Sequence, residues 1–274
     1  MSDVYNLMLQ EHDLSTNDGL RNATYEVMQQ VVLSGLYRGG FFKEAAFYGG
    51  TCLRIFHHLG RYSEDMDFSL LEQNPNFRFE DYFPAIVEEA KLLGREIVIT
   101  KKEKHNFSHI ESAFLKDNTD VYNLSFQTDK SLKIKIEVDT HPPLGFATEQ
   151  KLLLLPFSFH TRIFTLPCLY AGKMHALLFR AWKNRIKGRD WYDFEWYVRK
   201  GIKLDFAHLQ QRAYEFNAIE LTREVFLDKL RERLVNADIN MVKQDVEPFI
   251  INKRDLDIWS NDYFLQLAEM ISFA

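Results

Sequence analysis

The chain has 274 residues, of which 46% are hydrophobic and 14% aromatic, and its formal net charge is −5. This length and composition predict one large globular domain or two small ones, with a sizeable buried core. The acidic balance excludes a general nucleic-acid coat, which needs a broadly basic surface, but leaves room for a local basic groove. Two cysteines, Cys52 and Cys168, are too few for a disulfide framework.

The N-terminal segment MSDVYNLMLQEHDLS lacks both the basic start and the apolar stretch of a secretory signal. The sequence also contains no run of about 18 apolar residues, so a membrane span is not expected. Together with the small number of cysteines, these features predict a cytoplasmic protein with no membrane partner.

Over the first 160 residues, the hydrophobic pattern changes repeatedly between helical and strand-like spacing. The predicted elements are a helix over 20–37, strands over 44–48 and 64–71, a helix over 80–93, strands over 95–100, 107–115, 120–127 and 131–139, and a strand or loop over 151–165. After the first strand we expect a turn at Gly49 and Gly50, followed by a helix over 51–59. Thr51 is the predicted N-cap of that helix, and Gly60 is its predicted stop.

From Pro167 onward the pattern is helical, and Pro167 suits the first turn of a helix. The predicted helices span residues 168–186, 190–200, 205–216, 220–235, 239–251 and 261–271. The chain is therefore predicted to have an α+β fold. Residues 1–160 form a mixed sheet with flanking helices, and residues 161–274 form a helical domain.

Two aspartates on the strand predicted over 64–71 indicate a metal site. Asp65 and Asp67 are two residues apart, so their side chains project from one face of the strand. Clustered carboxylates repel each other, and Mg²⁺ relieves this repulsion because it favours carboxylate oxygens together with substrate phosphates. Without further support, solvated surface acids would be an equally good interpretation. Gly49 and Gly50 add that support, because glycines before a helix let backbone N–H groups approach a phosphate.

The strand predicted over 131–139 offers a third carboxylate. Lys133, Lys135, Glu137 and Asp139 share one of its faces, and apolar residues take the other. Phosphoryl transfer at a two-metal site needs a third acidic ligand or base from a neighbouring strand, and either acid could supply it. The two lysines also allow another interpretation, a solvated edge strand of mixed charge.

A cationic patch is predicted at the first helix of the C-terminal half. Lys173 and Arg180 lie on roughly one helical face, and further cations follow with no intervening acid. These further cations are Lys183, Arg185, Lys187 and Arg189. Triphosphate or an RNA backbone suits such a patch. For Lys183, Arg185 and Lys187, a solvated helix end or a weak RNA contact is the preferred interpretation. Asp190 begins the next helix, where it can cap the helix and also orient Lys173.

Two stretches together resemble the AbiEii-type nucleotidyltransferase toxins of the DNA polymerase β-like superfamily. They are FYGGTCLRIFHHLGRYSEDMDFSL (47–70) and AGKMHALLFRAWKNRIKGRDWYDFEWYV (171–198). The first matches the family pattern at Gly49, Gly50, Thr51, Arg61, Ser63, Glu64, Asp65, Asp67 and Phe68, and the second at Lys173, Arg180, Lys187, Arg189, Asp190, Tyr192 and Asp193. The resemblance implies a nucleotidyltransferase-type sheet domain, followed by a helical domain that contributes Lys173 and Asp190 to the site.

The resemblance also implies roles for particular residues. Asp65 and Asp67 bind metal, Glu137 occupies the third acidic position with Asp139 as the alternative, and Lys173 screens developing charge. The implied nucleotide-binding residues are Gly49, Gly50, Thr51, Arg61, Ser63, Lys173, Arg180 and Asp190.

The implied activity is metal-dependent transfer of a nucleoside monophosphate from an NTP to an acceptor, with Mg²⁺ or Mn²⁺ as the cofactor. The resemblance indicates RNA, such as a tRNA 3′ end, as that acceptor, and a toxin with a cognate antitoxin partner. Two alternatives remain open on the sequence. The same chemistry could modify a protein hydroxyl, or the chain could be a non-catalytic module that binds NTP or RNA.

Overall fold

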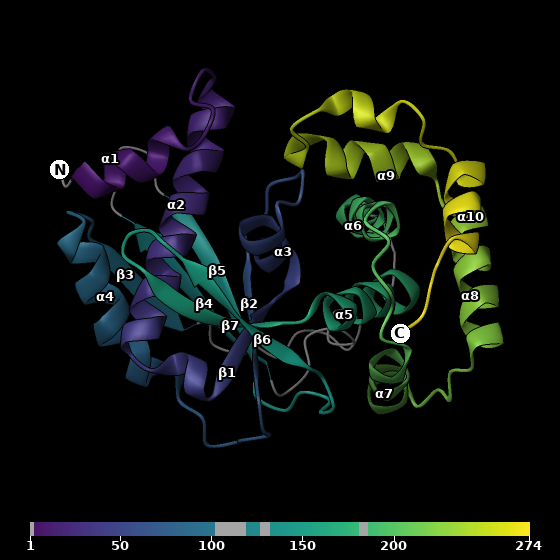
Figure 1. The fold of residues 1–274 in the computed structure, drawn as a ribbon, viewed down its shortest axis with the longest axis horizontal. Coiled ribbons are helices and arrows are strands. Elements are labelled where there is room, and N and C mark those ends of the chain that lie inside the picture. The colour runs from purple at the N-terminus through teal and green to yellow at the C-terminus, as the bar shows by residue number, and fades with distance from the viewer. Residues whose placement is uncertain (1–2, 102–118, 127–131, 181–185) are drawn as a thin grey trace. The chain divides into compact units, whose positions relative to one another are not determined.

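The computed structural model describes residues 3–101, 119–126, 132–180 and 186–274, and Figure 1 shows the fold. The chain forms two compact units. Unit 1 comprises Met1–His57, Ser63–Pro142 and Thr148–Ile163, and unit 2 comprises His58–Tyr62, Pro143–Ala147 and Phe164–Ala274. Two short segments of the first 160 residues, 58–62 and 143–147, therefore belong to the helical unit 2, although unit 1 flanks them in sequence.

Unit 1 is built on a seven-stranded mixed sheet in the order β3-β4-β5-β2-β1-β7-β6. Its strands are β1 (Ala45–Tyr48), β2 (Met66–Leu70), β3 (Ile97–Lys101), β4 (Thr119–Phe126), β5 (Leu132–Asp139), β6 (Thr148–Leu153) and β7 (Phe159–Phe164). The central β2 pairs antiparallel with β1 and parallel with β5. This mixed sheet with its helices confirms the predicted fold class.

The helices of unit 1 are α1 (Asp3–Gln10), α2 (Asn17–Arg38), α3 (Gly49–His57) and α4 (Phe83–Leu92). The hydroxyl of Thr16 caps α2 by accepting the backbone N–H of Gly19 at 2.9 Å. The long α2 contacts both β5 and α4, and Figure 1 shows α4 beside it. Gly35 allows the close approach to α4, because a Cβ built there would lie 2.7 Å from the Cα of Ile86.

Three parts of unit 1 differ from the prediction. The helix α1 has no counterpart in the predicted elements. The helix predicted over 80–93 divides into a 3₁₀ turn, Phe79–Tyr82, and α4, while the segment 151–165 contains the edge strand β6 and then β7. The strand predicted over 107–115 lies outside the described residues.

Unit 2 is helical. Its helices are α5 (Leu166–Phe179), α6 (Gly188–Arg199), α7 (Phe206–Asn217), α8 (Arg223–Val235), α9 (Ile239–Val246) and α10 (Asn261–Glu269). The buried Trp191 of α6 packs edge-on against Phe264 of α10, with 4.7 Å between ring centroids. The predicted helix over 168–186 is too long, because Arg180 is extended and ends α5. Among the described residues, no helix combines the length and apolar character needed to cross a bilayer.

We expect Gly35→Ala to destabilise unit 1. The new Cβ would overlap backbone of α4, and overpacking of this kind costs about 1–3 kcal/mol, only partly offset by the higher helix propensity of alanine. The free energy of unfolding from urea titrations followed by circular dichroism measures the effect.

Gly172→Ala is the matched control, because Gly172 also lies within a helix but a Cβ added there would meet no atom within 4 Å. Here only helix propensity changes, so the unfolding free energy should rise by up to about 1 kcal/mol. If both variants were stabilised, the contact between α2 and α4 would not be as close as the structure indicates.

Candidate active site

The predicted site residues fall in both units, and the two groups are described separately. In unit 1, the parallel pairing of β2 with β5 places Asp67 directly beside Glu137. The predicted strand over 64–71 carried both aspartates, but β2 begins at Met66, so Asp65 lies in the segment just before it. The recorded register starts with Met66 beside Ile136. Asp67 and Glu137 therefore lie side by side on two adjacent strands, with Asp65 just before β2, and all three carboxylates are partly exposed.

Gly49 is needed at this face for two reasons. Its φ of +81° lies in the left-handed region that favours glycine, and a Cβ at this position would overlap the carboxylate of Asp67. The positive φ lets the chain pass from β1 straight into α3, so the helix begins at Gly49. The prediction of Thr51 as the N-cap was therefore wrong. Gly60 is not the helix stop either, because α3 ends at His57, followed by His58 with a φ of +57°.

The segment that bears Asp65, just before β2, is tied to α3 and to α2. The hydroxyl of Thr51 is buried and donates to the backbone carbonyl of Asp65. The side-chain amide of Gln29, on α2, donates to the carbonyls of Ser63 at 2.9 Å and Glu64 at 3.1 Å. Gln29 was not predicted as a site residue. The available signal was a glutamine inside the apolar stretch of helix 20–37, which proves to be buried.

Lys135 lies within this acidic face. Its ammonium pairs with the carboxylate of Glu137. Burial by itself lowers the pKa of Lys135, but the carboxylates of Glu137, Asp65 and Asp67 together raise it above its usual value. The printed ion pair of Lys135 is with Glu137, and carboxylate oxygens are the ligands that a hard divalent cation prefers.

The carboxylates do not form a closed metal-binding cluster. Among the described residues, no three His, Cys, Asp or Glu side chains lie together as a group that could hold one ion. Asp139 lies farther along the strand, where its register partner is Ser69. It is buried and accepts the backbone N–H of His141 at 3.0 Å. Within unit 1 the register thus brings Glu137, and not Asp139, beside Asp67.

In unit 2 the predicted residues form a buried ion network. Nε and Nη2 of Arg61 donate to the two carboxylate oxygens of Asp193, at 2.7 and 2.6 Å. Nζ of Lys173 lies 2.8 Å from oxygens of both Asp190 and Asp193. Arg180 donates to the second oxygen of Asp190 at 2.7 Å. The contact between Lys173 and Asp190 is the one expected from the sequence.

The network keeps both aspartates charged although they are buried. Burial raises the pKa of Asp190, but the nearby charges of Lys173 and Arg180 lower it by a larger amount. The pKa of Asp190 therefore lies below its ordinary value. The pKa of Asp193 is lowered in the same way by Arg61 and Lys173. Arg61, predicted to bind nucleotide, is only 2% exposed and uses its guanidinium within this network. The missed residue is Asp193, which matched the family pattern but was not assigned a role.

Two of the remaining predicted cations, Lys187 and Arg189, lie among the described residues. Burial, and then Arg180, lowers the pKa of Lys187 to about 8. The guanidinium of Arg189 lies over the ring of Phe249, 4.3 Å from its centroid. Lys183 and Arg185 lie outside the described residues.

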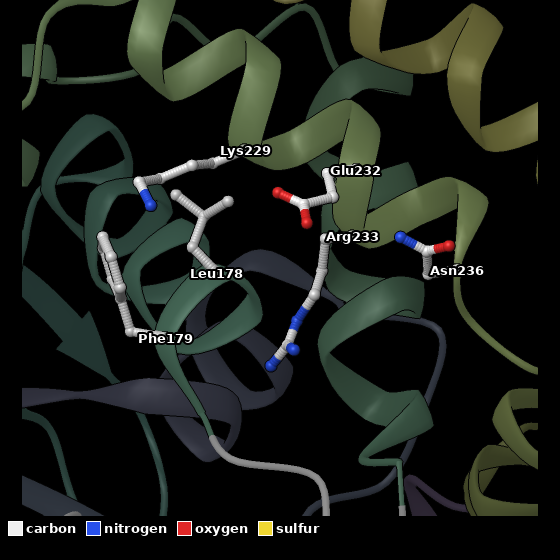
Figure 2. Close-up of a pocket in the computed structure, with 6 residues that line it drawn as sticks. All are labelled: Leu178, Phe179, Lys229, Glu232, Arg233 and Asn236. Carbon is white, nitrogen blue, oxygen red and sulfur yellow. The ribbon is translucent and has the colours of Figure 1, made fainter.

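Figure 2 shows a pocket of about 250 Å³ in unit 2, with side chains from α5 and α8 around it. Its lining residues are Leu178, Phe179, Lys229, Glu232, Arg233 and Asn236. The guanidinium of Arg233 donates to the backbone carbonyls of Leu177, at 3.1 Å, and Arg180. Arg233 thus satisfies carbonyls at the C-terminal end of α5, and none of the predicted site residues lines the pocket.

Comparisons with known proteins agree with these observations. The family model for the nucleotidyl transferase AbiEii toxin of type IV toxin–antitoxin systems matches residues 31–266. The match spans both motifs and confirms the family resemblance seen in the sequence. A comparison with curated proteins gave no match.

Solved structures with a similar fold include two bacterial proteins. MenT4, a nucleotidyltransferase toxin from Mycobacterium tuberculosis, aligns with a TM-score of 0.58 at 15% identity, over 98% of this chain and 94% of that chain. JHP933 from Helicobacter pylori aligns with a TM-score of 0.54 at 16% identity, over 91% and 90%. At these identities the likeness concerns the fold.

We expect Asp193→Asn to lower the free energy of unfolding at pH 7 by about 3–5 kcal/mol, because the buried guanidinium of Arg61 loses its carboxylate. Urea unfolding across a pH series measures this. Since the pKa of Asp193 is depressed in the folded chain, its ionic stabilisation is complete above the pKa of an unfolded aspartate, about 4. The difference from wild type should therefore be constant from about pH 5 to 8 and shrink at lower pH.

Asp228→Asn is the control, because its side chain is 78% exposed and its pairing with Arg231 is a surface contact at 3.5 Å. Its removal should change the unfolding free energy by less than about 0.5 kcal/mol. Equal losses in the two variants would mean that the buried network does not stabilise unit 2.

Proposed function

The chain belongs to the AbiEii family of nucleotidyltransferase toxins, and we propose that it transfers a nucleoside monophosphate from an NTP to RNA, such as a tRNA 3′ end, with Mg²⁺ or Mn²⁺ as cofactor. As a member of this family it is a nucleotidyltransferase, and membership in a toxin–antitoxin family implies NTP as substrate and an antitoxin as partner. We further propose the acceptor, the metal dependence and the residues that carry the reaction.

The observation that carries the proposal is the register of β2 with β5, which sets Asp67 beside Glu137, with Asp65 just before β2. Neighbouring carboxylates repel each other, and a bound cation relieves this repulsion. We assign Glu137 as the third carboxylate, because it is the register partner of Asp67. Asp139 already accepts a hydrogen bond from the backbone of its own loop.

The proposed reaction is a substitution at the α-phosphorus of the NTP. An acceptor hydroxyl oxygen forms a bond to the α-phosphorus, the bond from that phosphorus to the bridging oxygen of the β-phosphate breaks, and pyrophosphate leaves. The hydroxyl proton passes to solvent. A bound divalent cation would neutralise triphosphate charge and favour ionisation of the acceptor oxygen.

The chain's own residues serve this reaction in distinct ways. Asp65, Asp67 and Glu137 would hold the cation. The N-terminus of α3, where Gly49 and Gly50 are partly exposed, would direct backbone N–H groups and the positive end of the helix dipole at a phosphate. The role of Lys173 in screening developing charge stays a prediction from the family resemblance, and its ammonium is held by Asp190 and Asp193.

Asp65→Asn and Asp67→Asn should each lower transfer by about a hundredfold or more, because each removes a charged metal ligand. The assay follows label from α-³²P NTPs into total RNA in the presence of Mg²⁺. Glu64→Gln is the matched control, since it removes a neighbouring acid whose side chain is 42% exposed and lies 3.7 Å from Arg21. Its rate should stay near that of the wild type.

Chelation of divalent ions should abolish wild-type transfer, and adding Mg²⁺ or Mn²⁺ should restore it. Transfer of label to protein instead of RNA would support a protein acceptor. Thermal stabilisation by NTP and Mg²⁺ without transfer to either acceptor would support a binding module. Transfer that survives Asp65→Asn and Asp67→Asn would contradict the proposed site.

Glu137→Gln and Asp139→Asn distinguish the two candidates for the third carboxylate. Glu137→Gln should lower the transfer rate by about a hundredfold or more, as loss of a metal ligand does. Asp139→Asn should leave most of the rate, because an asparagine oxygen can still accept the N–H of His141. The reverse result would move the third ligand to Asp139. Circular dichroism melting curves of both variants verify that they fold.

A further inference from the structure

The acidic face of unit 1 contains a cation of its own. Lys135 is on β5, two residues before Glu137, and its ammonium pairs with that carboxylate. Its side chain is 37% exposed and that of Glu137 is 24% exposed. The ammonium also lies in the field of Asp65 and Asp67. The ion pair thus sets this lysine against one of the proposed metal ligands.

A divalent cation and this ammonium are drawn to the same carboxylates and repel each other. Binding of a divalent cation through Glu137 requires that this carboxylate give up or share its ion pair with Lys135. The lysine should therefore weaken the binding of a divalent cation added by itself. A triphosphate brings several negative charges of its own, so a cation that arrives with the triphosphate meets less net repulsion.

We propose that Lys135 is a built-in counter-ion of the carboxylate face, which weakens the binding of a free divalent cation and thereby favours its entry together with the NTP. This inference rests on the proposed function, because it takes Asp65, Asp67 and Glu137 as the metal ligands. Lys135 is a positioning residue here, since it acts through Glu137 and not on the substrate.

The same strand offers a matched comparison. Lys133 lies on the same face of β5 but is exposed. Its register partner on β4 is Ser125, whereas that of Lys135 is Asn123. Removing either lysine changes the net charge of the protein by one unit on the same face of the same strand. A specific effect of Lys135 on metal binding is thus separable from a general effect of charge.

The test measures Mn²⁺ binding to the full chain without nucleotide, by electron paramagnetic resonance of free Mn²⁺ and by calorimetry. Lys135→Met should bind Mn²⁺ more tightly than wild type by about tenfold, the scale of repulsion between a unit charge and a nearby divalent charge in water-like surroundings. Lys133→Met should change the affinity by less than about twofold, since solvent and salt screen its more distant charge. Lys135→Arg, which keeps the charge, should behave like the wild type.

Two further readouts do not depend on the Mn²⁺ titration. Mn²⁺ should raise the melting temperature of Lys135→Met more than that of wild type, because tighter binding to the folded state stabilises it more. In the transfer assay, the Mg²⁺ concentration that gives half the maximal rate should be lower for Lys135→Met. Circular dichroism spectra without metal verify that the variant folds.

Glu137→Gln separates failure of this inference from failure of the proposed function. If Glu137→Gln weakens Mn²⁺ binding but Lys135→Met does not strengthen it, the counter-ion role is overturned and the metal site is retained. Weaker binding by Lys135→Met also overturns it, because the lysine would then hold Glu137 in place for the metal. If Glu137→Gln leaves Mn²⁺ binding unchanged, the proposed metal site and the inference fail together.

Discussion

The parallel pairing of β2 with β5 is the constraint on which the candidate site depends. These strands are far apart in the sequence, yet their register sets Asp67 beside Glu137. A shift of one residue would turn one of the two carboxylates to the opposite face of the sheet. Gly49 reinforces the arrangement, because only a residue without a Cβ fits against the carboxylate of Asp67.

Unit 2 uses charge differently. Its buried aspartates, Asp190 and Asp193, are matched by Arg61, Lys173 and Arg180 at distances of 2.6–2.8 Å. Buried charges in this number are tolerated only when each is paired, so the network fixes the geometry of the group as a whole. In unit 1 the carboxylates of Asp65, Asp67 and Glu137 are partly exposed, and Glu137 pairs with the ammonium of Lys135.

Two residues of the family pattern make contacts within the protein. Arg61 and Thr51 belong to the family pattern, and both were expected to contact nucleotide. The guanidinium of Arg61 binds Asp193, and the hydroxyl of Thr51 holds the backbone of Asp65. Both side chains are buried, and each holds a neighbouring group in place.

The sequence by itself determined most of the described strands and helices, the α+β class, the family, and the common face of Glu137 and Asp139, because hydrophobic periodicity and short motifs are local properties of the chain. It could not tell which of Glu137 and Asp139 lies beside Asp67, or reveal the partners of Arg61 and Lys135. Those depend on strand register and on contacts between residues far apart in sequence, such as Arg61 and Asp193. Only the tertiary structure, through the pairing of β2 with β5 and the packing of unit 2, decided them.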